Sequence, residues 1–240
     1  MTAHKVCPEC KGEGLVWVNQ QRTFCECCRG SGIIKEGADI KIKNTGVKME
    51  RKVKVLGVDC SLNNCGVCIC EVDEHLNIKV IQTILNENNQ KFPKKMRQSF
   101  QDFEKAKAHA KFINEVIYGY QIEIVVAEIP CGSQSSRACT SAGVVTGLLG
   151  SIAIKKPLVG VTPIEVKKAS VGINTASKDD IIAWCLETHP EITPPTRKVH
   201  GVQEVLKKFE HEADSVAIVT AGVQNSDFQR EISLLLKNKV

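Results

Sequence analysis

The 240-residue sequence has few aromatic side chains and no long apolar run. Aromatic residues make up 5% of the chain, so few side chains are available to stack on nucleic-acid bases. No apolar stretch reaches the roughly 18 residues that a membrane span requires. The first ten residues, MTAHKVCPEC, lack the apolar core of a signal peptide. We therefore expect a cytoplasmic protein without a membrane segment.

The remaining composition is that of an ordinary globular protein. Hydrophobic residues account for 42% of the chain and charged residues for 25%, which suits one medium domain with a small appendage. The formal net charge of +5 does not by itself imply a nucleic-acid partner, because local clustering of charge is the stronger argument.

Twelve cysteines are many for a reducing compartment, and five of them lie in the first 28 residues. The half-motifs CPECKGEG and CECCRGSG both fit C-x-x-C-x-G-x-G. Fourteen residues separate Cys10 from Cys25, and the strand-like runs LVWV and RTF lie between the half-motifs. This spacing predicts a zinc ribbon over residues 1–36 with one structural Zn²⁺. The predicted ligands are Cys7, Cys10, Cys25 and Cys28. Cys27 is spare and could replace one of them, and a disulfide framework is the weaker alternative.

The half-motifs resemble the zinc module of DnaJ chaperones, reduced here to one pair. Such a ribbon could grip DNA, contact a protein partner or extend a dimer surface. Residues 37–52 follow as a basic linker, which is either a solvated connector or a strap over phosphates. Four later cysteines are expected to pack as small hydrophobic residues in a hairpin: Cys60, Cys65, Cys68 and Cys70.

The main domain is expected over residues 53–225, with a tail helix over 226–240. Three strands in a meander precede strands that alternate with helices, which predicts an α/β fold with a mixed five-stranded sheet flanked by helices. The expected strands are 53–59, 66–70, 77–85, 122–128 and 158–161. The expected helices are 92–120, 135–154, 162–171, 177–187 (capped by Ser177) and 202–223, and residues 188–201 are expected to be irregular.

Three distant segments each set an acid against an apolar element. VKVLGVD ends in Asp59, IVVAEIP contains Glu128, and HEADSVAI contains Asp214. A carboxylate at the end of a buried strand is costly unless something pairs with it. His211 lies three residues before Asp214 on a predicted helix, so both can point to the same spot, whereas Glu212 is expected to face away. Carboxylates gathered without basic partners would repel one another, which predicts a divalent metal site.

Four segments in order resemble the motifs of RuvC-type Holliday junction resolvases. They are GVDCSLNNCG, VVAEIP, VKKASVGINTASK and HEADSVAI, and the resemblance spans residues 53–222. It implies an RNase H-like fold, a homodimer, and cleavage of branched DNA such as four-way junctions. The helices expected over 92–120 or 135–154 are candidates for the dimer interface. The position of His211 is often aspartate in this family.

The resemblance also implies the site chemistry. Two Mg²⁺ ions per active site, for which Mn²⁺ can substitute, would hydrolyse the phosphodiester. Asp59 would bridge the ions, Glu128 and Asp214 would complete the sites, and His211 would bind one ion or orient water. Lys178 matches a position associated with catalysis or DNA contact, and Lys167 one associated with DNA contact. Further candidates for DNA contact follow Glu128: Ser133, Gln134, Ser135, Ser136 and Arg137.

Other functions stay open at this point. Cys131 stands where a family member carries an aromatic residue, so recognition of DNA shape is favoured over recognition of sequence. A broader nuclease for flaps, forks or RNA–DNA hybrids would use the same metal chemistry. A non-catalytic junction-binding module, with the ribbon recruiting a partner, is an alternative of another class. An actin-like ATPase is disfavoured because Gly-rich phosphate loops are poorly matched.

Overall fold

The computed structural model of the chain describes residues 4–6, 11, 15–18, 21–24, 33–35, 51–132 and 135–238. The chain divides into two compact units, Met1–Met49 and Glu50–Val240. In the first unit, β1 (His4–Val6) pairs with β4 (Ile33–Lys35) and β2 (Leu15–Val18) with β3 (Gln21–Phe24), both antiparallel. The strand-like runs between the half-motifs therefore form a hairpin. The predicted zinc ligands and Cys27 lie outside the described residues.

The second unit is built on a five-stranded mixed sheet in the order β7-β6-β5-β8-β9. The meander strands are antiparallel, and β8 and β9 add parallel to β5. The bounds are β5 (Lys52–Cys60), β6 (Asn64–Asp73), β7 (Ile78–Glu87), β8 (Ile124–Glu128) and β9 (Leu158–Val161). The predicted mixed five-stranded sheet is confirmed.

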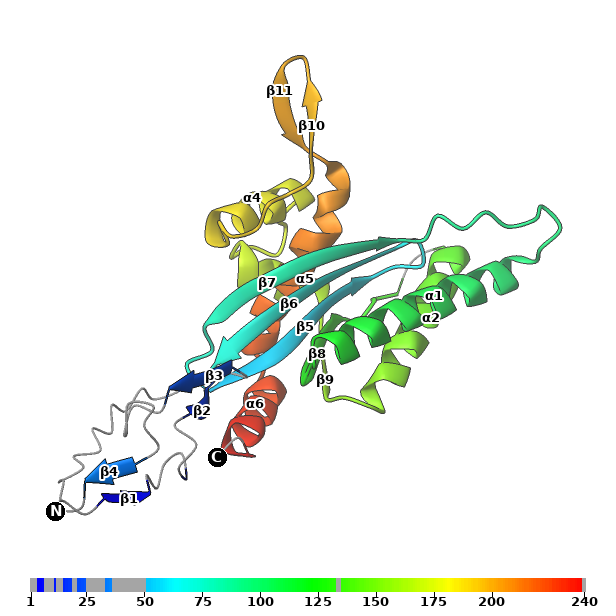
Figure 1. Cartoon of the computed structure of the whole chain (residues 1–240). Coiled ribbons are helices and arrows are strands. Elements are labelled where there is room, and N and C mark those ends of the chain that lie inside the picture. The colour runs from blue at the N-terminus through cyan, green and yellow to red at the C-terminus, as the bar shows by residue number, and fades with distance from the viewer. Residues whose placement is uncertain are drawn as a thin grey trace. The chain divides into compact units, whose positions relative to one another are not determined.

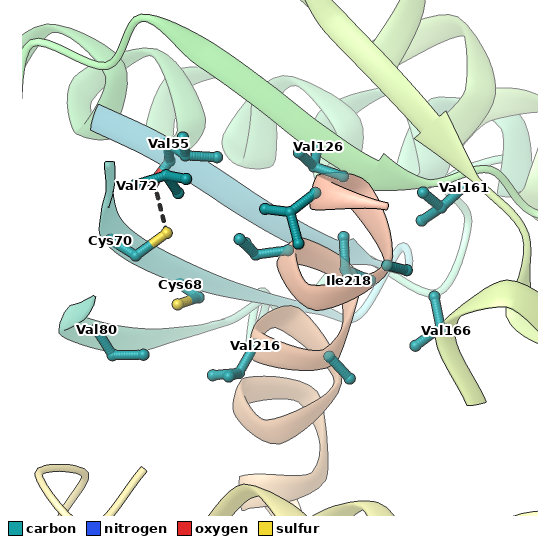
Figure 2. Packing of buried hydrophobic residues seen from close by; sticks show 14 of the residues in the cluster. Val55, Cys68, Cys70, Val72, Val80, Val126, Val161, Val166, Val216 and Ile218 are labelled. Atoms are coloured by element: carbon teal, nitrogen blue, oxygen red, sulfur yellow. Dashed lines mark hydrogen bonds between the residues drawn. The ribbon is translucent and has the colours of Figure 1, made fainter. Parts of the chain in front are cut away.

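Helices cover both faces of this sheet (Figure 1). Because side chains alternate along a strand, Leu56 and Val58 pack on one side with α1 (Gln98–Gly119) and α2 (Ser136–Ala153). Val55 packs on the other side with α5 (Glu210–Val223). Figure 2 shows this second core, where the Cys70 thiol donates a hydrogen bond to the Val55 carbonyl at 3.6 Å. Cys65, Cys68 and Cys70 are free and buried, and Cys60 is free and half-buried, as expected of packing residues.

Three short helices and the tail complete the unit. Thr162 begins α3 (Pro163–Ser170) and Ser177 begins α4 (Lys178–Thr188), each with a complete capping box. A single 3-10 turn, η1 (Lys207–Phe209), leads into α5, and α6 (Ser226–Asn238) forms the tail helix. In the part of the chain that the structure describes, no helix is both long and apolar enough to cross a membrane.

Glycines bring α5 unusually close to the sheet. A Cβ atom built at Gly66 would lie 2.1 Å from the His211 carbonyl oxygen, and one at Gly57 would lie 2.2 Å from the Ser215 carbonyl oxygen. The backbones of β5 and β6 therefore nearly touch the helix backbone, which no other residue type permits. This close approach places the first turn of α5 against the ends of both strands.

The expected helix over 92–120 begins later, at Gln98. Pro93 disfavours helical geometry at Phe92. A turn follows, in which the Met96 amide donates to the Pro93 carbonyl at 2.9 Å. The predicted start was therefore wrong by about two turns.

The expected helix over 202–223 is also wrong in its first part. An antiparallel hairpin of β10 (Thr196–Val199) and β11 (Val202–Val205) occupies residues that were expected to be irregular or helical. His200 and Gly201 form its turn with positive φ angles of 47° and 87°. A two-residue turn of this kind matches the twist of the flanking strands.

Candidate functional site

Asp59 and Glu128 lie at the same edge of the sheet. The strands β5 and β8 are parallel neighbours, and Val58 and Ala127 are their last register pair. Asp59 comes directly after Val58, and Glu128 comes directly after Ala127. By alternation, Asp59 shares the face of Val55, and Glu128 shares that of Val126, which is the face that α5 covers. Two carboxylates distant in sequence thus reach the first turns of α5.

His211 links α5 to Asp59. Its Nδ1 lies 2.7 Å from Asp59 Oδ2, and Asn64 Nδ2 lies 3.0 Å from its Nε2. With the Asn64 amide donating to Nε2, the ring carries its proton on Nδ1 and donates to the carboxylate. The hydrogen bond that His211 donates to Asp59 raises the pKa of His211, against the opposing effect of partial burial. Asn64, in the polar turn after Asp59, was not foreseen as a site residue.

The carboxyl groups of Glu128 and Asp214 have pKa values well above their usual range. Burial, followed by repulsion from Asp59 and Asp214, raises the pKa of Glu128 to about 7. Burial and repulsion from Asp59 likewise raise the pKa of Asp214 to about 7. The lysines Lys167 and Lys178 oppose the shift at Glu128, but they do not cancel it. The three carboxylates therefore have too little positive charge around them, and an oxygen-rich donor set of this kind suits Mg²⁺.

The cluster also contains a basic residue, Lys178, which the sequence marked as a candidate for catalysis or DNA contact, and an acid beside it, Glu210, which was not foreseen. Lys178, at the start of α4, lies 3.0 Å from Glu210 Oε2. Partial burial lowers the pKa of Lys178, but the hydrogen bond that it donates to Glu210 and the charges of the nearby acids raise its pKa overall. Glu210 is four residues before Asp214 on α5, so the helical spacing of these two acids was the signal that could have identified it.

Glu212 faces away from this cluster, as expected. Its carboxylate accepts a 2.6 Å hydrogen bond from Thr83 Oγ1 on β7, and the residue is buried. It therefore helps to hold α5 on the sheet.

A polar stripe on α1 holds the site from the opposite face of the sheet. Asp102, Lys105 and His109 share one side of the helix by their spacing of three and four residues. Lys105 Nζ donates to Asn63 Oδ1 at 2.6 Å, and His109 Nε2 lies 3.2 Å from the Leu62 carbonyl oxygen. Both contacts fix the turn that carries Asn64.

Arg137, predicted to contact DNA, is engaged with the buried carboxylate of Asp102. Its Nη2 lies 2.7 Å from Asp102 Oδ1, and its Nη1 bonds Oδ2. Asp102 is 2% exposed, and the hydrogen bonds from Arg137 lower its pKa. The pair ties the start of α2, which follows the Glu128 loop, to α1.

Replacing Arg137 with Leu is expected to lower the free energy of unfolding by about 2 kcal/mol. The change leaves Asp102 buried without its counter-charge, and we place the cost below that of a fully buried pair because the Arg137 side chain is 48% exposed. Chemical denaturation measures the difference. Arg230→Leu is the matched control, since Arg230 pairs with Asp227 on the surface at 67% and 65% exposure and should cost under about 0.5 kcal/mol. Equal losses in both variants would contradict a buried role for the Arg137 pair.

A second cluster lies across the sheet from the carboxylates. The ligand atoms of Cys60, Cys65 and His109 lie within 4.8 Å of one another. Both ring nitrogens of His109 are already engaged, Nε2 with Leu62 and Nδ1 with Asn86 at 3.0 Å. We therefore interpret this trio as a hydrogen-bonded cluster.

The other predicted contact residues lie around the same edge. Ser135 caps α2, where its hydroxyl accepts a hydrogen bond from the Ala138 amide, and Ser136 is exposed. Lys167 is half-buried on α3, close enough to Glu128 to affect its pKa. Ser133 and Gln134 lie outside the described residues.

Comparisons with known proteins agree on the fold. No protein-family model matches the chain, and no curated protein matches it. Thermus thermophilus RuvC is similar with a TM-score of 0.52 and 18% identity, over 75% of this chain and 97% of that one. The same protein in complex with a Holliday junction substrate gives 0.53 and 18%, over 71% and 92%. The yeast mitochondrial Holliday junction resolvase gives 0.51 and 14%, over 78% and 85%. The main domain therefore has the RNase H-like fold of the RuvC-type Holliday junction resolvases.

Proposed function

We propose that the protein is a Mg²⁺-dependent, structure-selective endonuclease that cuts four-way junctions and other branched DNA. The observation that carries this proposal is the 2.7 Å contact between His211 and Asp59, with Glu128 and Asp214 at the same edge of the sheet. The similarity of fold to Holliday junction resolvases supports the choice of substrate.

Asp59, Glu128 and Asp214 would hold the metal ions, with Asp59 shared between them. When bound, the two ions would supply an activated water and stabilise the leaving 3′ oxygen. His211 keeps the Asp59 carboxylate in place through Nδ1. Lys178 stands at the first turn of α4, where its charge and the backbone N–H groups favour a phosphate. Lys167, Ser135 and Ser136 are further candidates for contact with the DNA backbone.

The stability of the metal-free protein is expected to depend on pH near neutrality, because two of the proposed metal ligands titrate there. The folded-state pKa values of Glu128 and Asp214 are about 7, above the roughly 4.3 and 3.9 of an unfolded chain. Protonation therefore stabilises the folded state, fully below about pH 4, and this contribution is lost as the pH rises through about 7. The raised pKa of His211 acts in the same direction.

Without magnesium, we expect the melting temperature to fall between pH 5 and pH 8, and added Mg²⁺ should restore most of the loss at pH 8. Thermal melting at a series of pH values measures both effects. Asp214→Asn should flatten the profile, whereas Asp227→Asn, which changes an exposed acid on α6, should leave it unchanged. A wild-type profile that does not change with pH would contradict the raised pKa values.

A homodimer is part of the proposal, because symmetric cleavage of a junction needs two sites facing opposed strands. Helix α1 or helix α2 is the proposed interface. Phe100 and Phe103 on α1 are 59% and 60% exposed, which supports α1 as an apolar contact surface.

We also propose one structural Zn²⁺ bound by Cys7, Cys10, Cys25 and Cys28, in a ribbon that contacts DNA or a protein partner.

A cleavage assay on labelled substrates tests the proposed function. Four-way junctions, flaps, forks, RNA–DNA hybrids, linear duplex and single strands should be compared at equal concentration with Mg²⁺ and with Mn²⁺. We expect paired, symmetric cuts in the junction and little cutting of linear duplex. Equal cutting of all duplex substrates would refute structure selectivity. Tight junction binding without cutting in either metal would favour the non-catalytic alternative.

A further inference from the structure

The hairpin β10–β11 extends away from the sheet and its covering helices (Figure 1). Six of its eight strand residues are exposed. A two-stranded hairpin without a packed face is marginally stable alone, so this one draws little stability from burial. Its exposed faces are available to a partner.

Local contacts give the hairpin a defined shape. Its strands pair in register from Thr196 and Val205 to Val199 and Val202. Thr196 Oγ1 donates to Gln203 Oε1 at 3.1 Å, and the Leu206 amide closes the base by donating to the Pro195 carbonyl at 2.8 Å. The positive φ angles at the turn match the twist of the strands. The hairpin is therefore an ordered ribbon.

The hairpin and the turn after it concentrate positive charge. Residues 196–208 contain four lysines and arginines against one acid, Glu204, so this short segment has a formal charge of +3 of the chain's +5. Arg197 and Lys198 are adjacent, and both are exposed. Neighbouring residues of a strand point to opposite faces, so each side of the ribbon carries a basic side chain. Arg197 lies 3.5 Å from its cross-strand partner Glu204 in an exposed ion pair, which DNA phosphates can replace at little cost.

The base of the hairpin is anchored beside the candidate metal site. Lys208 Nζ lies 2.9 Å from Glu87 Oε2, and Glu87 is the register partner of Asn64, which contacts His211. The chain then enters α5 at Glu210, which pairs with Lys178. A DNA strand held at the carboxylates would thus have the basic ribbon next to it.

We propose that the hairpin β10–β11 binds one duplex arm of the branched substrate, with Arg197 and Lys198 on its phosphates. This inference rests on the proposed function and names the element that receives the arm. A two-stranded ribbon has dimensions that the major groove of B-DNA admits, and the charge of the segment is complementary to the phosphate backbone. The metal site positions the scissile phosphate, and the ribbon positions the helix leading to it.

The test is the salt dependence of junction binding by the full chain, without added divalent metal. Each phosphate contact contributes about 0.9 to the slope of log K against log salt. Arg197→Gln with Lys198→Gln should therefore reduce the slope by about 1.8 relative to the unchanged protein. The matched control is Lys79→Gln with Lys155→Gln, which removes equal charge from exposed residues at the opposite end of the sheet and should keep the slope. Fluorescence anisotropy gives the binding constants, and a melting curve shows whether each variant is folded.

Shortening the junction arms provides a second readout. The difference between the hairpin variant and the unchanged protein should disappear when the arms are too short to reach the ribbon. An unchanged slope in a folded hairpin variant, while the unchanged protein binds and cuts junctions, overturns the proposal and leaves an acidic protein as the partner of the ribbon. The proposal is also overturned if the hairpin variant and the control double variant lose the same amount of slope in the plot of log K against log salt. Failure of the unchanged protein to cut or prefer junctions refutes the proposed function instead.

Discussion

Replacing Asp59 with Asn is expected to lower the rate of Mg²⁺-dependent junction cleavage about 1000-fold. The amide keeps the shape of the side chain and still accepts the hydrogen bond from His211 Nδ1, but it removes the charge shared by both proposed ions. A metal ion contributes several kcal/mol of charge stabilisation in a transition state, and about 4 kcal/mol corresponds to about three orders of magnitude in rate. Single-turnover cleavage at saturating protein measures the change in rate without a contribution from binding.

The same substitution should leave the fold intact and change the pKa values of the neighbouring acids. Asp59 raises the pKa of both Glu128 and Asp214, so these two pKa values should fall in the variant. The metal-free protein should melt at the same temperature or higher, because repulsion between the acids is relieved. Asp227→Asn is the control on an exposed acid and should cut normally. Cleavage at the normal rate by the folded Asp59→Asn protein would remove Asp59 from the site.

The acids at the strand ends could be predicted from the sequence because local pattern and position in the chain both mark them. A continuous apolar run predicts a central strand, and the acid that ends it must lie at the sheet edge. Asp59 and Glu128 follow from this argument, and the spacing of His211 and Asp214 follows from helical geometry. The five-stranded sheet was predictable for the same reason, since each strand has its own pattern.

The supporting contacts depend on tertiary structure, and no local pattern marks them. Asn64 contacts a histidine 147 residues away, and Lys105 reaches a turn 42 residues away. A lysine on an amphipathic helix is expected to face solvent, because the sequence does not show which turn packs beside the helix.

The hairpin β10–β11 was not predicted for another reason. Its strands are short and mostly polar, so no period of buried residues distinguishes them from a loop.

Replacing Gly66 with Ala is expected to destabilise the domain by about 3 kcal/mol or more, at the upper end of the cost of overpacking. The new Cβ would lie 2.1 Å from the His211 carbonyl oxygen and 2.4 Å from its carbonyl carbon. These are backbone atoms, so no rotamer change relieves the clash, and the first turn of α5 must move. A domain of this size should lose roughly 6 to 12 °C in melting temperature for that cost.

The displacement should also reach the site, because His211 is the residue pushed away and its bond to Asp59 is 2.7 Å long. A misplacement of about 1 Å can lower a rate about 100-fold, so we expect a loss of that order in the Gly66→Ala protein at a temperature where it remains folded. Gly143→Ala is the matched control: nothing lies within 4 Å of its added Cβ, and alanine in a helix interior should stabilise by about 0.5 to 1 kcal/mol. If Gly66→Ala melted like the control and cut at the rate of the unchanged protein, α5 would not approach β6 as closely as this geometry requires, and the placement of His211 beside Asp59 would lose its structural basis.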